Sequence, residues 1–390
     1  MVDPAQLSEV RGRKIRIAEN KEAFVPGELP PEIRYSAPFV SLLSESQTQL
    51  GRLDALANFV PSIRLFVIPS LRTEAWASTR IEGTRASMPE VFVHDARSAD
   101  IETSNRDIRE VMNYKMAMHT GLALLDELPV CNRLVKRVHR TLLEGTRGEQ
   151  LTPGEFRTLQ VEVGAYVPPP ANYVTALMSE WEAFTSDPPD DMPVLVHSAI
   201  VHYQFEAIYP FFDGNGRAGR LLIPFLLCAR GVLEQPLLSM SVYFEANRTE
   251  YFDRLLAVSE KRDWEGWICF FLRGVLSQAQ RTVACCQDMI ELRQRYLETA
   301  EEGSRSPNIA RVVDMLFENP YITAPRVSHE LDVTYQTGRN VLNALMELGI
   351  VEEASRETSS GAQIYLAHEV MELISGIAEP PAVRPGAAPS

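Results

Sequence analysis

The chain has 390 residues, 45% of them apolar and 23% charged, and a formal net charge of −14 at pH 7. This length and apolar content allow a large buried core and favour two or three domains. The acidic balance argues against broad nucleic-acid binding, because such binding depends on Lys and Arg side chains that neutralise phosphates.

No segment predicts secretion or insertion into a membrane. The N-terminal 20 residues contain several arginines, such as Arg11 and Arg16, and lack the apolar centre of a signal peptide. The longest apolar run, residues 221–229, is about half as long as a membrane-spanning helix requires. The five cysteines show no C-x-x-C spacing, which favours buried free thiols. We therefore expect a cytoplasmic protein.

In chain order, the pattern predicts a mainly α-helical fold. Residues 1 to about 35 are polar and rich in proline, so we expect an arm on the surface. Apolar residues then recur at helical spacing from residue 38 to residue 77, with interruptions expected at Pro61 and Pro69. Further helical patterns follow at about 104–125, 130–145, 172–185, 193–208, 216–230 and 248–258.

Turn-forming residues mark the remaining boundaries. The segment from Thr152 to Pro170 is rich in proline and glycine, which predicts a surface loop or a short hairpin. A charged helix ends near Glu302, and residues 303–307 are typical of a linker. The last residues combine proline with alanine and glycine, so we expect a disordered tail.

The region after the linker predicts a separate module. Apolar spacing indicates three helices between about residues 308 and 348, followed by short strands at 350–353 and 363–366. This order resembles a winged helix-turn-helix. Between residues 306 and 366 the basic residues are Arg311, Arg326, Arg339 and Arg356, while the acidic residues are Asp314, Glu318, Glu330, Asp332, Glu347, Glu352, Glu353 and Glu357. This charge balance does not favour DNA binding, and packing or dimerisation is an equal alternative.

The chemistry of the sequence concentrates after the helix expected at 193–208. That helix ends at Pro210, and Asp213-Gly214-Asn215-Gly216 would not continue it, whereas a helical pattern resumes at Arg217. The segment therefore predicts a turn that leads into a helix N-terminus, where free N–H groups and the helix dipole bind anions. Arg217 and Arg220 could contact the same phosphates, and Asp213 could bind Mg²⁺. Taken alone, such a turn or such an arginine pair is ordinary.

The full ordered set resembles the Fic (filamentation induced by cAMP) family, whose motif is H-P-F-x-D/E-G-N-G-R-x-x-R. Every specified position from Pro210 to Arg220 matches, and the resemblance covers about residues 30–275. Typical Fic proteins transfer AMP from ATP to a hydroxyl group of a target protein. The resemblance implies a Fic-type helical core with a short β-hairpin flap, and ATP and Mg²⁺ as ligands.

The resemblance also implies roles for single residues. Asp213 would bind Mg²⁺. The anion hole would consist of Gly214, Asn215 and Gly216, and the phosphates would be held by Arg217 and Arg220. Tyr243 and Asn247 would lie near the adenine, although core packing explains Tyr243 equally well.

A second match lies upstream. The segment Ser78-Thr79-Arg80-Ile81-Glu82-Gly83 resembles the inhibitory motif of the family, S/T-x-x-x-E-G/N. A carboxylate of Glu82 placed against Arg220 would neutralise the side chain that should hold the γ-phosphate. The alternative is an ordinary helix C-terminus closed by Gly83, with Ser78 inside the helix and Glu82 solvated.

The motif departs from the family at its first residue, where Tyr209 replaces the histidine that serves as general base. A tyrosine with a pKa near 10 is only about 0.1% ionised at pH 7, so an unperturbed Tyr209 is a poor base. The nearby arginines and a metal ion could lower its pKa, or Tyr209 could act as a nucleophile. His202 lies about 10 Å away along the helix and His197 lies farther, so neither is expected to replace the base. The flap, between Glu155 and Pro170, is also shorter than is typical, which puts the usual protein target in doubt.

We therefore expect an ATP-binding Fic-type protein adenylyltransferase that is autoinhibited through Glu82, with activity weakened or altered by Tyr209. The alternatives are a catalytically silent nucleotide sensor, a de-AMPylase or other nucleotidyl transferase, and a transcriptional regulator that acts through the C-terminal module. The target is open, and a homodimer is compatible with the resemblance. The expected divisions are an N-terminal helical region with the inhibitory helix (1–95), a Fic core (96–285), a linker helix (286–305), a winged-helix domain (306–372) and a disordered tail (373–390).

Overall fold

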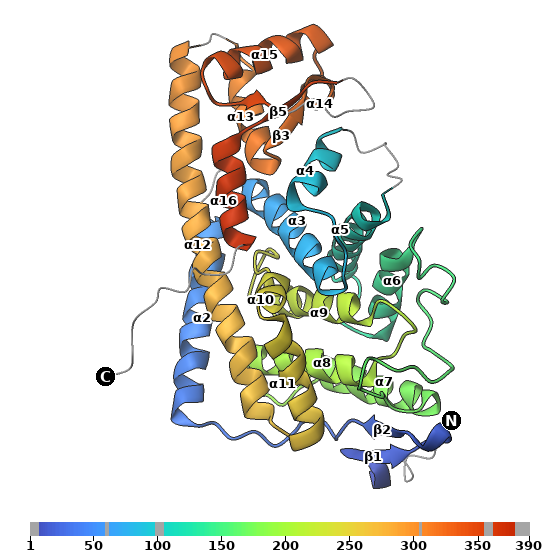
Figure 1. Ribbon diagram of the computed structural model, residues 1–390. Coiled ribbons are helices and arrows are strands. Elements are labelled where there is room, and N and C mark those ends of the chain that lie inside the picture. Colours follow the sequence, from blue (N-terminus) through green and yellow to red (C-terminus); the bar gives the residue numbers. More distant parts are fainter. Residues whose placement is uncertain (1–7, 59–61, 98–104, 304–305, 355–361, 379–390) are drawn as a thin grey trace.

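A computed structural model describes residues 8–58, 62–97, 105–303, 306–354 and 362–378, and it is mainly helical (Figure 1). The N-terminal part contains β1 (Arg13–Arg16), η1 (Ala18–Asn20), β2 (Glu22–Val25), α2 (Ala37–Asn58), α3 (Arg64–Ile81) and α4 (Met88–Arg97). The central part contains α5 (Arg106–Leu124), α6 (Asn132–Leu143), α7 (Ala171–Ser186), α8 (Val194–Ile208), α9 (Asn215–Ala229), α10 (Met240–Ala246) and α11 (Arg248–Lys261). The last part contains α12 (Trp264–Gly303), α13 (Ile309–Glu318), β3 (Tyr321–Thr323), α14 (Ala324–Leu331), α15 (Tyr335–Glu347), β4 (Glu352–Glu353), β5 (Ile364–Leu366) and α16 (His368–Ala378).

Helix α8 is the centre of the core. Its side chains are buried on every side, including the polar side chains of His197 and His202. A helix that is apolar on all faces is stable only when other helices surround it, and α8 packs against α7, α9, α11 and α12. The loop that follows α8 therefore starts from a rigid element.

Helix α12 joins the core to the C-terminal module. It is 40 residues long, or about 60 Å at the rise of an α-helix, and runs along one side of the molecule beside α2 and α16 (Figure 1). The boundary expected between the core (96–285) and a linker helix (286–305) falls inside this unbroken helix. The boundary was wrong because buried side chains such as Cys286, Met289 and Tyr296 continue the apolar face.

The C-terminal module contains the three predicted helices and a small antiparallel sheet. The strand order is β3-β5-β4, and Tyr321 to Thr323 of β3 pair with Leu366 to Ile364 of β5. Strand β3 was not predicted. The side chain of Thr323 accepts a hydrogen bond from the Arg326 N–H, which caps α14.

The expectation of a disordered tail from residue 373 was wrong in its first part. Residues 373–378 complete α16, because Val370, Ile374 and Ile377 form an apolar stripe that is buried in the core. This helix packs against α12 and α3. Residues 379–390 lie outside the described residues.

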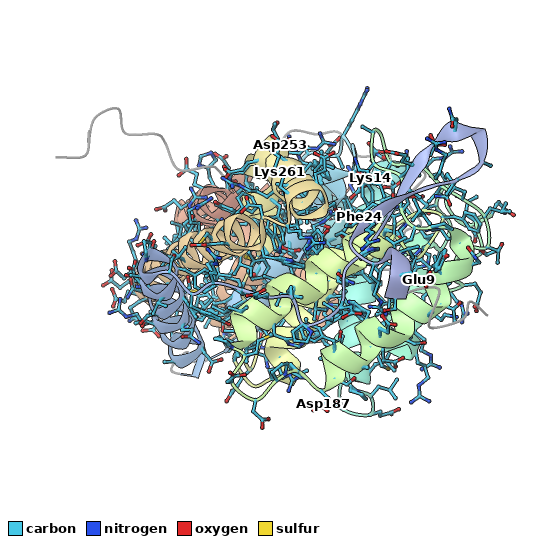
Figure 2. All side chains as sticks on the ribbon, turned by 90° about the horizontal axis from the view of Figure 1, so that it is seen from below. Glu9, Lys14, Phe24, Asp187, Asp253 and Lys261 are labelled. Atoms are coloured by element: carbon cyan, nitrogen blue, oxygen red, sulfur yellow. The ribbon has the colours of Figure 1, made fainter. Side chains whose placement is uncertain are left out.

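The expected N-terminal surface arm is partly a β-hairpin. Strands β1 and β2 are antiparallel, with Arg13 opposite Val25. The arm prediction failed because Ala23 and Val25 are fully buried, and apolar residues of a four-residue strand leave little periodic signal. Figure 2 shows Lys14 and Phe24 on this hairpin, on the face that also carries Lys261 at the end of α11.

Pro69 does not interrupt the chain as expected, because it lies inside α3. A proline removes one helical hydrogen bond, but buried side chains on both sides of it, such as Phe66 and Leu71, hold the helix together. Pro61 lies outside the described residues. The short helices α4 and α10 were not predicted.

Candidate active site

The motif loop connects α8 to α9. Tyr209 ends α8 in the left-handed backbone conformation (φ 51°), and Gly214 adopts the same conformation (φ 76°) immediately before α9. The first N–H groups of a helix have no partners within that helix. The predicted turn into a helix N-terminus is therefore present, and its free amides can bind an anion.

The side chain of Asn215 closes this loop. Its Oδ1 accepts a hydrogen bond from the Phe211 N–H (2.8 Å), and its Nδ2 donates to the Phe211 carbonyl (2.9 Å). Asp213 Oδ1 accepts from the Gly214 N–H (2.8 Å), and its side chain remains partly exposed. Asn215 thus shapes the loop, while the Asp213 carboxylate stays accessible to a ligand.

Arg220 is held by the residues of the predicted inhibitory motif. It donates to the Ser78 hydroxyl (2.8 Å) and the Ser78 carbonyl (3.0 Å), and it pairs with Glu82 (2.7 Å). Gly83 closes α3 with a positive φ of 96°. A side chain at Gly216 would collide with the Glu82 carboxylate. The segment is therefore both a helix C-terminus closed by Gly83 and a site where the Glu82 carboxylate pairs with Arg220.

Arg217 lies away from the loop surface. It is buried, and its guanidinium faces Glu110 (3.3 Å) and Asp213 (3.6 Å). Its Nε has no hydrogen-bond partner among the described residues. In this structure Arg217 ties α9 to α5, whereas Arg220 reaches the pocket described next.

A pocket of about 390 Å³ opens beside the loop. Its polar end contains Glu82, Glu206, Tyr209, Gly216, Arg220 and Arg248. Its apolar part contains Ile81, Val163, Ala165, Tyr166, Ala207, Phe252, Leu255 and Leu256. Tyr203 and Ser259 also line it, and their hydroxyl groups are hydrogen-bonded to each other (2.8 Å). The volume and composition are those of a small-molecule site.

Neither of the two residues expected near an adenine is among the residues that line this pocket. The ring of Tyr243 packs on Phe270 (5.1 Å between centroids), and the Asn247 side chain donates to the Tyr243 carbonyl (2.9 Å). Instead, Phe252 and Leu256 of α11 face the pocket and are partly exposed. Their apolar spacing was visible in the sequence but is typical of core packing.

Tyr209 is not activated by its surroundings. Burial raises its pKa above the ordinary value, and the nearby carboxylates of Glu82, Glu206 and Asp213 raise it further. The expectation that nearby arginines lower the pKa of Tyr209 was therefore wrong, while the effect of a bound metal ion stays a prediction. His202 is bonded to the Gly219 carbonyl and the Tyr251 hydroxyl (2.9 Å each), and burial lowers its pKa to about 3.

His139 of α6 is a residue that sequence reasoning missed. Its Nδ1 accepts from the Gly154 N–H (2.9 Å), so the ring proton lies on Nε2, which donates to the Asp213 carbonyl (2.7 Å). The ring stacks on Phe211 at 3.7 Å, and burial lowers its pKa to about 4. This neutral histidine connects the motif loop to the start of the flap. A lone histidine in an amphipathic helix gives no signal of that role.

The flap is held against the motif. Val163 and Tyr166 form a single antiparallel bridge, which is less than the expected hairpin strands. The Tyr166 hydroxyl donates to the Ala207 carbonyl (2.7 Å), and buried Arg157 donates to the Tyr209 carbonyl (2.8 Å). The Phe24 N–H of β2 also donates to the Val167 carbonyl (2.9 Å), so the N-terminal hairpin supports the flap from outside.

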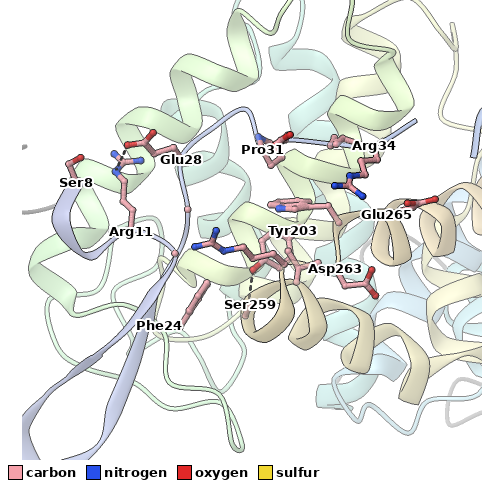
Figure 3. A pocket seen from close by; sticks show the side chains of 17 residues that line it. Ser8, Arg11, Phe24, Glu28, Pro31, Arg34, Tyr203, Ser259, Asp263 and Glu265 are labelled. Atoms are coloured by element: carbon pink, nitrogen blue, oxygen red, sulfur yellow. Dashed lines mark hydrogen bonds and ion pairs between the residues drawn. The ribbon is translucent and has the colours of Figure 1, made fainter. Parts of the chain in front are cut away.

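A second pocket, of about 670 Å³, shares Tyr203 and Ser259 with the first (Figure 3). It lies between the N-terminal segment and the junction of α11 and α12, and its walls mix arginines such as Arg11 with acids such as Asp263. None of the motif residues 209–220 lines it. Of these motif residues, Tyr209, Gly216 and Arg220 line the first pocket instead.

Comparisons with known proteins agree with this architecture. The Fic/DOC family model matches residues 129–227, and the Fic/DOC family N-terminal model matches residues 40–123. Proteins named protein adenylyltransferase Fic are similar to the chain: that of Drosophila virilis is 26% identical over 253 residues (62% of this chain, 50% of the relative), and that of Drosophila willistoni is 30% identical over 255 residues (62% and 49%).

Two solved structures share the fold. A Fic family protein from Desulfovibrio desulfuricans G20 has a TM-score of 0.56 at 22% identity, covering 86% of this chain and 98% of that one. Fic-1 from C. elegans has a TM-score of 0.51 at 20% identity, covering 64% and 75%.

The helical core, with its glycine-rich loop between α8 and α9, places the chain in the class of Fic-fold proteins. It is a Fic-domain protein that carries the N-terminal region of the Fic/DOC family, as the sequence motif predicted. The chain spans only about half the length of these two Drosophila relatives. Within the described residues, no helix combines the length and apolar character that crossing a membrane requires.

Proposed function

We propose that this chain is an ATP-dependent protein adenylyltransferase that is held in a restrained state by Glu82. The observation that carries the proposal is the ion pair between Arg220 and Glu82 at the polar end of the pocket. The relatives named protein adenylyltransferase Fic support the activity.

The phosphates of ATP would bind between the N-terminus of α9 and Arg220. The free amides in the first turn of α9 and the helix dipole favour an anion there. In this structure the Arg220 guanidinium donates hydrogen bonds to Ser78 and Glu82. A γ-phosphate that needs the same guanidinium would have to displace Glu82, and this competition is the physical basis of the restraint.

The donor set fits a magnesium ion bound together with a nucleotide. Mg²⁺ is usually held by one or two carboxylates and by substrate phosphates, and the loop offers the partly exposed carboxylate of Asp213. Bound there, the ion would neutralise charge on the phosphate oxygens. Arg217 would support the metal ion indirectly, because its contact with Asp213 orients the carboxylate that binds the ion.

The nucleobase would occupy the apolar part of the pocket. Phe252 and Leu255 of α11 offer one wall, and Val163 and Ala165 of the flap line the pocket as well. The hydroxyl pair of Tyr203 and Ser259 would offer polar groups to the edge of the base. These residues replace Tyr243 and Asn247 in our assignment of the base site.

Transfer of label from α-labelled ATP, with Mg²⁺ and self-modification as the readout, tests the proposal. Removal of the restraint by Glu82→Gly should raise labelling at least tenfold, and Glu82→Gly combined with Arg220→Ala should abolish the gain, because an arginine that holds a phosphate contributes about 3 kcal/mol. Glu245→Gly is a matched control, since Glu245 pairs with exposed Arg80 of the same helix end.

Other outcomes would select a different function. ATP binding without transfer in any variant would favour a nucleotide sensor. If the chain removes AMP from a modified protein, and the Glu82→Gly variant does not, a de-AMPylase would be favoured. Salt-sensitive DNA binding that depends on Arg339 of α15 would favour a transcriptional regulator, against the acidic charge of the module.

A further inference from the structure

The pocket contains a carboxylate that the motif chemistry does not use. Glu206 lies in the last turn of α8, three residues before Tyr209, and both line the same pocket together with Arg220. The Glu82 carboxylate is already paired with Arg220. Glu206 is therefore the acidic group of this pocket that is left without an assigned partner.

A glycine leaves room for Glu206. A side chain at Gly219 of α9 would collide with Glu206 Oε1. That oxygen is shielded from solvent and has no hydrogen-bond partner among the described residues. A buried acceptor without a donor costs about 1–3 kcal/mol. The carboxyl group as a whole is part-exposed and lines the pocket, so a hydroxyl group bound there could pass a proton to it.

The charges around Glu206 come from three other elements. Burial raises its pKa, Arg220 of α9 lowers it, and Glu82 at the end of α3 raises it, with a resulting pKa of about 7. The hydroxyl of Tyr251 on α11 and that of Tyr209 also lie within electrostatic reach. A carboxyl group of this kind is about half ionised at neutral pH, which suits a general base.

We propose that Glu206 is the proton acceptor of AMP transfer in this protein, in place of the missing motif histidine. This inference rests on the proposed function. The oxygen of the attacking hydroxyl forms a bond to the α-phosphorus, and the bond from that phosphorus to the oxygen bridging to the β-phosphorus breaks. Pyrophosphate leaves with the bonding electron pair, and the hydroxyl proton passes to the Glu206 carboxylate. Tyr209 keeps its own proton throughout.

The inference makes the importance of Glu206 depend on the residue at position 209. In the Glu82→Gly background, Glu206→Gln should lower the rate of label transfer by about a hundredfold, the usual contribution of a general base. When Tyr209→His is also present, the same Glu206→Gln change should lower the rate far less, because the imidazole accepts the proton. Glu206→Asp, which keeps a carboxylate, should recover part of the rate. Thermal melting and ATP affinity of each variant show whether it is folded.

The dependence on pH gives an independent readout. With Tyr209 present, the rate should rise with pH as Glu206 ionises and then level off. The rise should lie below pH 7 in the Glu82→Gly background, because loss of the Glu82 charge removes one cause of the raised pKa. The Glu206→Gln variant should lack this rise.

Equal losses from Glu206→Gln with Tyr209 and with histidine at position 209 would overturn the inference, because they would indicate a structural role. Label transfer that requires Tyr209→His would also overturn it, while the fold would remain a competent transferase. Absence of transfer in every variant, including Glu82→Gly with Tyr209→His, would overturn the proposed function together with the inference.

Discussion

At the scale of single residues, the site is supported by buried polar side chains that the motif does not name. His139 connects the motif loop to the flap, and Glu110 pairs with buried Arg217. Buried polar groups of this kind are stable only when their partners are present. The sequence motif predicted the loop itself. Its partners Glu110 and His139 lie in α5 and α6, far from the loop in sequence, so the motif could not predict them.

The buried histidines predict a loss of stability in mild acid. Burial lowers the pKa of His139 to about 4, of His197 to about 4 and of His202 to about 3. Below pH 6.5 the unfolded chain binds protons that the folded chain does not, so the free energy of unfolding falls as pH drops from about 6.5 toward 4, by about 3 kcal/mol for each such residue. Urea titrations at a series of pH values check this.

A matched pair of variants isolates one contribution. His139→Gln should flatten the pH dependence and lower stability at pH 7 by about 2 kcal/mol, because two hydrogen bonds and a ring contact change. His368→Gln, at an exposed histidine of α16, should change neither. An unchanged pH dependence in His139→Gln would contradict the assignment of a neutral, buried ring.

At the scale of elements, α3 links the pocket to the C-terminal module. Its C-terminal end carries Glu82 to Arg220, while Arg72 in its middle pairs with Asp95 of α4 (2.6 Å) and donates to the Glu318 carbonyl of α13. Burial alone would raise the pKa of Asp95, but Arg72 and Lys115 lower it to about 2. Helix α3 is thus held at its C-terminal end and at its middle.

Replacement of Arg72 tests this link. Arg72→Met leaves the buried Asp95 with Lys115 as its remaining partner, so the free energy of unfolding should fall by about 3 kcal/mol. Arg64→Met is the matched control: its pairing with Glu318 is also between α3 and α13 but its side chain is 71% exposed, so the loss should stay below about 1 kcal/mol. Denaturant unfolding distinguishes the two, and equal losses would contradict the assignment.

The elements also show the limits of the sequence pattern. Long amphipathic or wholly apolar helices such as α8 and α9 were predicted close to their observed bounds, because their periodicity is strong. The N-terminal hairpin, β3 and α10 were missed, since a few residues carry little periodicity and depend on partners from distant segments. Within the site, the motif positions predicted the turn and the contact of Glu82 with Arg220. The pocket wall formed by α11 depends on tertiary packing and could not be predicted from the motif.

At the scale of the whole molecule, α12 and α16 hold the core and the C-terminal module together (Figure 1). Truncation after Ala367 should expose the apolar faces that α16 covers, because Val370, Met371, Ile374 and Ile377 are buried. Each such side chain contributes about 1.5–3 kcal/mol, so this variant should melt at a markedly lower temperature. Truncation after Ala378 keeps the helix and should melt near the full chain. Equal melting temperatures would contradict the packing described for α16.

The most direct test of the central claim is the affinity of the natural chain and of Glu82→Gly for ATP and for AMP, measured by calorimetry with Mg²⁺. If Glu82 occupies the guanidinium that a γ-phosphate needs, Glu82→Gly should bind ATP about tenfold more tightly, a change of about 1.4 kcal/mol, and should bind AMP almost as the natural chain does. Equal strengthening for both nucleotides, or none for ATP, would contradict the account.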